Sequence, residues 1–130
     1  MTGEPVTYVI DGARIRTLDD VFTLAGEAVR GEGGYFGRNL DAFADCLTGG
    51  YGTPEDGRFY FVWENSSRSR EALGYTETAR QLGRRLERCH PTNRDRVRAD
   101  LERALRKDGP TAFDWGVDIF EFRDVRLDLR

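Results

Sequence analysis

Residues 35–49 read Tyr35-Phe36-Gly37-Arg38-Asn39-Leu40-Asp41-Ala42-Phe43-Ala44-Asp45-Cys46-Leu47-Thr48-Gly49. Asp41 and Asp45 are four residues apart, and residues at that spacing lie on the same face of a helix. Thr48 falls close beside them. Another face of the same helix carries the apolar residues Leu40, Phe43, Ala44 and Leu47. We therefore expect this helix to bury its apolar stripe and to turn both acids outward.

Both ends of this helix are marked in the sequence. Asn39 can cap the first free backbone N–H groups, and Gly49-Gly50 is a common way for a helix to end. The helix is preceded by a loop that contains several glycines, from Gly31 to Gly37, and two aromatic residues. The acids thus follow directly on an aromatic, glycine-rich loop, as expected of a binding surface.

The flanking sequence predicts a strand on each side. Residues 6–10 are rich in β-branched and aromatic residues, and residues 59–63 form a continuous apolar run typical of a strand buried on both faces. Between the first strand and the loop, Thr17 and Asp20 form an approximate capping box, which predicts a helix over about residues 18–30. The run at 59–63 is expected to be the central strand.

The second half predicts two more helices and a last strand. One helix is expected to start at Ser66 or Ser67 and to end before Pro91, with Gly74 and Gly83 weakening its continuity. The next is expected after Asn93, with an apolar stripe up to residue 105. Residues 117–122 alternate with a period of two and are predicted to be a strand, which residues 125–129 extend along an edge.

The order strand, two helices, strand, two helices, strand predicts an α/β fold. We expect a three-stranded parallel sheet covered by about four helices, with a possible extra strand extension at the C-terminus. At 130 residues the chain is expected to form one domain over residues 1–130. No internal repeat is visible.

The composition is typical of a globular protein. Hydrophobic residues make up 38% and charged residues 33% of the chain. The sequence has no apolar run long enough to span a membrane and no signal peptide, so a cytoplasmic location without membrane contact is expected. Cys46 and Cys89 are then expected to be reduced and unpaired.

The segment from Tyr35 to Gly49 resembles the barstar family of ribonuclease inhibitors. The pattern of that family is an aromatic pair, a glycine, any residue, Asn-Leu-Asp-Ala, a variable pair, and an acid followed by Cys-Leu-Thr-Gly. This chain matches it with Tyr35-Phe36, Gly37, Asn39-Leu40-Asp41-Ala42 and Asp45-Cys46-Leu47-Thr48-Gly49. The resemblance can be followed over roughly the first 65 residues and implies a barstar-like fold.

The resemblance also implies a function and a binding site. It implies a cytoplasmic immunity protein that inhibits a secreted, barnase-like or guanyl-preferring bacterial ribonuclease, with no catalysis and no cofactor. Asp45 would take the place of the substrate phosphate among the cationic groups of the enzyme, and Asp41 would add a second contact. The implied partner-binding residues are Tyr35, Phe36, Gly37, Asn39, Leu40, Asp41, Ala44, Asp45, Thr48 and Gly49.

Two positions depart from the family pattern. Ala44 stands where the best-known member of the family has tryptophan, so an aromatic anchor is absent. Arg38 replaces an acid, and its charge weakens the attraction toward a cationic site by about 1 kcal/mol at surface dielectric. The partner therefore need not be barnase itself.

Enzymatic and metal-binding alternatives find little support. The two acids lack the second group of a glycosidase or the histidine of a metal site, and Cys46 lacks a histidine base. The only histidine, His90, adjoins Cys89, and such a pair is a weak signal for a metal site. The glycine-rich loop lacks the Lys-Ser or Lys-Thr of a phosphate-binding loop.

The arginines of residues 80–106 could instead form a nucleic-acid surface. Acids interrupt this stretch, namely Glu77, Glu87, Asp95, Asp100 and Glu102. We expect a solvated helical face with ion pairs and no direct nucleic-acid binding. An RNA-associated or regulatory module on the same fold, and immunity against a toxin that is not a ribonuclease, remain as alternative functions.

Overall fold

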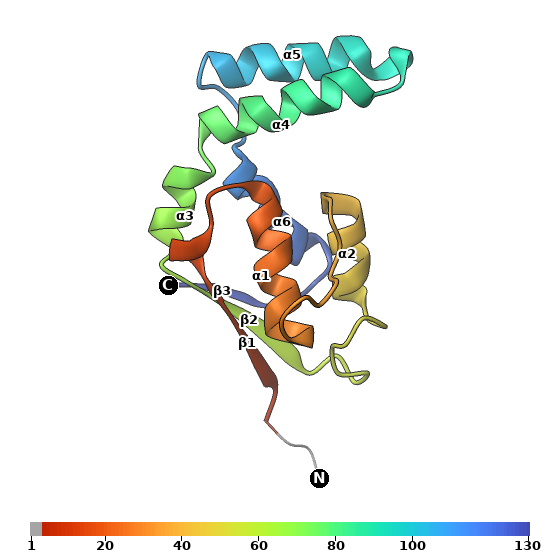
Figure 1. Cartoon of the computed structure of the whole chain (residues 1–130), viewed down its shortest axis with the longest axis vertical. Coiled ribbons are helices and arrows are strands. Elements are labelled where there is room, and N and C mark those ends of the chain that lie inside the picture. The colour runs from red at the N-terminus through yellow and green to blue at the C-terminus, as the bar shows by residue number, and fades with distance from the viewer. Residues whose placement is uncertain (1–3) are drawn as a thin grey trace.

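The computed structural model describes residues 4–130, and its centre is a parallel β-sheet (Figure 1). The three strands are β1 (Val6–Asp11), β2 (Phe59–Glu64) and β3 (Leu127–Leu129), in the order β1-β2-β3. Both neighbouring pairs are parallel, with Ile10 beside Trp63 and Trp63 beside Leu129. The predicted α/β class, the three-stranded parallel sheet and the central position of residues 59–63 are confirmed.

Alternation along β1 shows how the sheet is buried. Ile10 is fully buried, whereas its neighbour Val9 is 48% exposed, because successive side chains point to opposite faces of a sheet. The buried face carries Ile10, Phe61 and Trp63 into the main core. The Trp63 indole N–H donates to Ser69 Oγ at 2.9 Å, so the polar atom of this buried ring is satisfied.

Three helices supply the other side of this core: α1 (Leu18–Arg30), α2 (Leu40–Thr48) and α6 (Ala112–Phe122). Figure 1 shows them together on one side of the sheet. The predicted capping box of α1 is confirmed, because the Asp20 carboxylate accepts from the Thr17 N–H at 3.1 Å. These three helices position the residues discussed below.

A helical hairpin extends away from the sheet at the top of Figure 1. It consists of α4 (Tyr75–Arg88), the short 3-10 helix η2 (Pro91–Asn93) and α5 (Arg94–Leu105). Its own apolar cluster contains Leu82, Val97 and Ala104, and Trp115 of α6 packs against both this cluster and the main core. The hairpin therefore has a small core of its own.

The structure contains more helices than the sequence predicted. A 3-10 helix η1 (Gly12–Arg14) follows β1, and the helix expected from Ser66 onward divides at Gly74 into α3 (Ser66–Ala72) and α4. The residue preceding α3 is Asn65, in a left-handed conformation, so neither Ser66 nor Ser67 is the cap. Residues 4–130 thus contain six α-helices rather than about four.

The strand predicted over residues 117–122 is wrong, since these residues belong to α6. Thr111 and Asp114 cap this helix reciprocally, with the Asp114 carboxylate accepting from the Thr111 N–H at 2.9 Å. The helix buries Ala112, Phe113, Gly116 and Phe120, which recur at helical spacing. The last strand is β3, within the residues expected only as an extension. Among residues 4–130, no helix is both long and apolar enough to cross a bilayer.

Candidate partner-binding site

Asn39 begins α2 as the sequence predicts. Its Oδ1 atom accepts a hydrogen bond from the Ala42 N–H at 2.8 Å, which satisfies a donor that a helix N-terminus leaves free. Gly49 follows the last helical residue with a φ of 130°, in the region that favours glycine. Residues within or next to α2 therefore determine both of its ends.

The buried face of α2 is built around Phe43. This ring is fully buried, and its centroid lies 5.3 Å from that of Phe22, 5.8 Å from that of Phe36 and 5.5 Å from that of Phe120. Edge-on and tilted contacts of this kind are favourable for aromatic rings. They fix the rotation of α2 about its own axis, and with it the direction in which the opposite face points.

The opposite face carries the acids into solvent, as predicted. Asp41, Asp45 and Thr48 are exposed, and the Asp45 side chain is 71% exposed. The Thr48 hydroxyl donates to the backbone carbonyl oxygen of Asp45 at 2.6 Å and not to its carboxylate. Two carboxylates thus project from a helix whose opposite face is packed in the core.

The loop before α2 is fastened at Phe36 and Gly37. Phe36 is buried in the main core, and Gly37 has a φ of 94°. A Cβ atom at Gly37 would lie 2.5 Å from the Phe43 backbone nitrogen, so no larger residue fits there without displacing α2. Tyr35 next to them is exposed, and its ring centroid lies 6.5 Å from that of Tyr51. Tyr35 from this loop and Tyr51 from the segment after α2 therefore form an exposed aromatic pair.

The residues expected to bind a partner fall into two groups. Tyr35, Asn39, Asp41, Asp45 and Thr48 are exposed, and Leu40 and Gly49 are half-buried. Phe36, Gly37 and Ala44 are buried, Ala44 with only 4% of its surface exposed. The structure brings both groups together around α2, and the buried three support the surface without forming much of it.

Two further residues join this surface from α6 and the turn after it. The Arg123 Nη2 atom lies 3.4 Å from Asp45 Oδ1, and Phe122 beside it is 76% exposed. The strand predicted over residues 117–122 concealed both residues, which the structure places in and directly after α6. The signal that could have found them is the capping box at Thr111 and Asp114, which predicts a helix through this region.

Cys46 is buried, and His90 caps a short helix. Burial raises the pKa of the Cys46 thiol, and the charge of Asp45 raises it further, so the thiolate is disfavoured. His90 Nδ1 accepts from the Thr92 N–H at 3.2 Å and caps η2. Within residues 4–130, no three His, Cys, Asp or Glu side chains lie close enough together to hold a metal ion.

Comparison with known proteins assigns the family. The family model described as Barstar (barnase inhibitor) matches residues 6–102, which include β1, α1, α2 and β2. No curated protein matches the chain. Arg123 and Phe122 lie beyond the matched residues. Because the match covers more than half of the chain and includes the acidic helix and its loop, this protein belongs to the barstar family.

Proposed function

We propose that this protein inhibits a bacterial ribonuclease of the barnase type by inserting α2 and the preceding loop into the active site of the enzyme. The observation that carries this proposal is the outward presentation of Asp41 and Asp45 from a helix held by Phe43. Membership of a family of barnase inhibitors supports it. In this proposal the inhibitor acts in the cytoplasm, as an immunity protein against a secreted enzyme.

The inhibition is by occupancy of the phosphate site. A ribonuclease must stabilise a phosphodiester, so its active site contains arginine, lysine or histidine donors that point inward. A carboxylate at that position makes charge-assisted hydrogen bonds but offers no bond to cleave. Asp45 takes this role. Asp41, one helical turn earlier, adds a second contact and increases the negative potential that attracts the enzyme.

The neighbouring residues complete the contact surface. Tyr35 and the backbone at Gly37 lie against the rim of the enzyme, and Thr48 and Gly49 cover the far end of α2. Phe122 adds an exposed aromatic ring against Arg123, which contacts Asp45, on a surface where Ala44 is buried. Aromatic side chains are enriched among the residues that dominate binding energy, so Phe122 is a suitable anchor.

Inhibition assays with guanyl-preferring bacterial ribonucleases test this proposal. The wild-type protein is expected to abolish RNA cleavage by a cognate enzyme at equimolar concentration. Asp45→Ala is expected to weaken inhibition by more than about 30-fold, the effect that defines a binding hot spot. Association is also expected to slow as salt is added, because added ions screen the attraction between acids and cationic site.

Asp95→Ala serves as the matched control. The Asp95 side chain is fully exposed on α5. Its removal changes the net charge as Asp45→Ala does, but at a position outside α2. Inhibition by the control should be close to that of the wild-type protein. Equal inhibition by the Asp45→Ala and wild-type proteins would contradict the proposed mechanism.

A further inference from the structure

A groove of about 330 Å³ lies beside the N-terminal end of α2, between α1 and α4. Its lining includes four arginines and one carboxylate, namely Arg38, Arg84, Arg85, Arg88 and Asp19. A second hollow of about 340 Å³ shares Asp19, Arg38 and Arg84 with it and extends it to Gly37. We call this surface the arginine groove.

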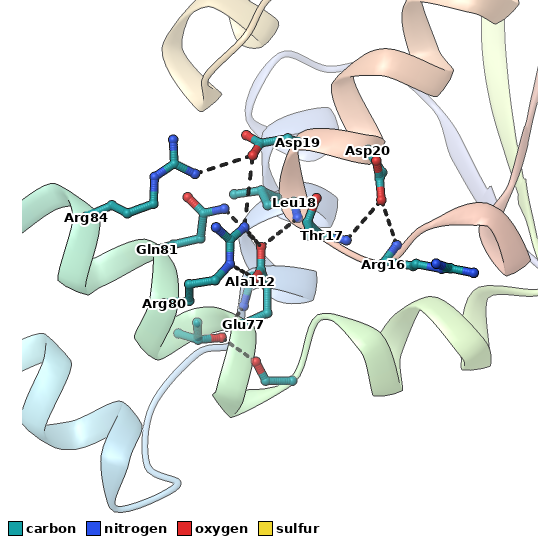
Figure 2. A network of polar contacts seen from close by, with 12 residues as sticks. Arg16, Thr17, Leu18, Asp19, Asp20, Glu77, Arg80, Gln81, Arg84 and Ala112 are labelled. Carbon is teal, nitrogen blue, oxygen red and sulfur yellow. Dashed lines mark hydrogen bonds and ion pairs between the residues drawn. The ribbon is translucent and has the colours of Figure 1, made fainter.

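The spacing of the arginines on α4 explains why they meet in one groove. Gln81, Arg84, Arg85 and Arg88 occupy positions i, i+3, i+4 and i+7, so they lie on one face of the helix. Contacts with α1 hold this face in place (Figure 2). The Asp19 carboxylate lies 3.4 Å from Arg84 Nη1 and 4.0 Å from Arg80 Nη2. A single carboxylate is thus shared between two arginines.

Positive charge is therefore in excess in the arginine groove. Arg85 lies over the Trp115 ring, with its guanidinium carbon 5.5 Å from the ring centroid. Arg38 and Arg88 are exposed, and within residues 4–130 neither takes part in a hydrogen bond or ion pair with another side chain. Their guanidinium groups are free to bind an oxyanion, and a guanidinium binds a carboxylate through two parallel hydrogen bonds.

The arginine groove is continuous with the acidic surface of α2. Arg38 directly precedes the cap residue Asn39, and Leu40 lines the groove. Arg38 and Asp45 are seven positions apart, which corresponds to about 10 Å at the rise of a helix. The surface thus has arginines before the first turn of α2 and the carboxylates of Asp41 and Asp45 along the helix itself. A partner that covers both parts must carry acids opposite the groove and cations opposite α2.

We propose that the arginine groove binds carboxylates of the ribonuclease, located on the rim of its cationic active site. This inference rests on the proposed function and adds a feature of the partner: an acidic patch at the edge of a basic cleft. Charge complementarity of this kind selects partners and sets their orientation, because the four arginines would repel a ribonuclease whose rim is basic.

RNA fits this surface less well than an acidic protein. Asp41 directly follows Leu40, which lines the groove, and Asp45 lies one helical turn further on, so both acids repel a phosphate backbone that continues along α2. Proteins that bind single-stranded RNA also stack bases on exposed aromatic rings. The exposed rings of Tyr35, Tyr51 and Phe122 are not part of the groove lining.

A charge-reversal experiment tests the inference on the ribonuclease that the wild-type protein inhibits. Arg38→Glu combined with Arg88→Glu is expected to weaken inhibition by at least about 10-fold, because like charges then face each other across the groove; this loss must exceed the gain from the acid that the family pattern has at position 38. Arg96→Glu combined with Arg106→Glu is the matched control, since both residues are exposed outside the groove and the change in net charge is the same. The control should retain inhibition within about 3-fold of wild type.

Comparison with Asp45→Ala separates the two proposals. If Asp45→Ala loses inhibition but the groove variant matches its control, the arginine groove does not contact the enzyme and this inference is overturned, while the proposed function stands. If only the groove variant loses inhibition, the groove contact stands and the role of Asp45 is wrong. Circular dichroism and thermal unfolding of each variant show that the fold is intact.

Filter binding with a single-stranded oligouridylate tests whether RNA binds in the arginine groove. The wild-type protein and the groove variant are expected to retain the RNA equally weakly at low salt. Retention that falls steeply with salt and disappears in the Arg38→Glu, Arg88→Glu protein, but not in its control, would assign the groove to RNA and overturn the inference.

Discussion

Asp45 carries its charge beside a cation of the same chain. The Arg123 Nη2 atom lies 3.4 Å from its carboxylate, and Asp45 remains 71% exposed. An ion pair this exposed contributes less than about 1 kcal/mol to the free energy of unfolding. In the proposed complex its effect on encounter is larger, because the arginine offsets the negative potential at the point where the cationic site of the enzyme would approach.

Arg123→Ala is expected to speed association with the inhibited ribonuclease. Removing the positive charge should raise the association rate constant about 2–5-fold at low ionic strength, and the difference should shrink as salt is added. Stopped-flow kinetics of complex formation measure both quantities. Arg123→Lys keeps the charge and should associate at the wild-type rate. A slower association of Arg123→Ala would indicate instead that Arg123 holds Asp45 in its binding position.

At the scale of elements, one carboxylate joins α4 to α1. Glu77 Oε2 accepts from the Leu18 N–H at 2.9 Å, from Gln81 Nε2 at 2.9 Å and from Arg80 Nη2 at 2.8 Å (Figure 2). Leu18 is the first residue of α1, so Glu77 satisfies a free donor of a helix 59 residues away in sequence. The prediction that Glu77 lies on a solvated helical face is wrong, since Glu77 is only 6% exposed.

Glu77 is expected to make folding stability depend on pH. Burial alone would raise the pKa of this carboxyl, but the hydrogen bonds from Arg80, Gln81 and Leu18 outweigh burial and lower it. The folded state therefore binds the proton less readily than the unfolded chain. The resulting stabilisation is complete above the ordinary pKa of glutamate and is lost as the pH falls through the lowered value.

Glu77→Gln tests this contribution. The variant is expected to lower the free energy of unfolding by about 1.5–3 kcal/mol at neutral pH, because hydrogen bonds to a charged acceptor become bonds to a neutral one. The deficit should shrink in strongly acidic buffer, where the wild-type carboxyl is protonated as well. Urea unfolding at the two pH values measures it. Glu87→Gln, exposed on the same helix, should differ little from wild type at either pH. A deficit for Glu77→Gln that is equal at both pH values would contradict the assignment.

At the scale of the whole molecule, the chain has two apolar clusters of unequal size. The main core joins the sheet to α1, α2 and α6, whereas the α4–α5 hairpin encloses Leu82, Val97 and Ala104. A cavity of about 240 Å³ lies between them, bordered by Leu40, Leu82 and Trp115. Trp115 contacts both clusters. Packing between hairpin and body is thus less continuous than packing within the body.

Val97→Ala is expected to loosen the hairpin separately from the sheet. The substitution removes buried volume from the smaller cluster and should cost about 1–3 kcal/mol of local stability. Hydrogen exchange of backbone amides should then accelerate in α4 and α5 but not in β2. Phe61→Ala, in the main core, is the contrasting variant and should accelerate exchange in both regions. Equal acceleration in β2 and α5 by Val97→Ala would show that hairpin and sheet open as one unit.

Features with local causes could be predicted. Asn39 accepts a hydrogen bond from the Ala42 N–H, three residues later, and Thr17 and Asp20 are also three residues apart, so the N-terminal ends of α2 and α1 could be predicted. The apolar run at residues 59–63 predicted its own burial at the centre of the sheet. The outward direction of Asp41 and Asp45 followed from helical spacing alone. Residues 117–122 were misassigned because apolar residues at alternate positions are compatible with a strand and with a helix.

The sequence by itself determined the acidic helix, its cap, the loop before it and the parallel α/β fold, because each depends on residues a few positions apart or on one apolar run. Only the tertiary structure decided that Glu77 caps α1, that Arg123 lies against Asp45 and that the arginines of α4 meet Arg38 in one groove. These contacts join residues 59, 78 and 46 or more positions apart. Partners so distant are brought together by packing of whole helices, and no local pattern specifies them.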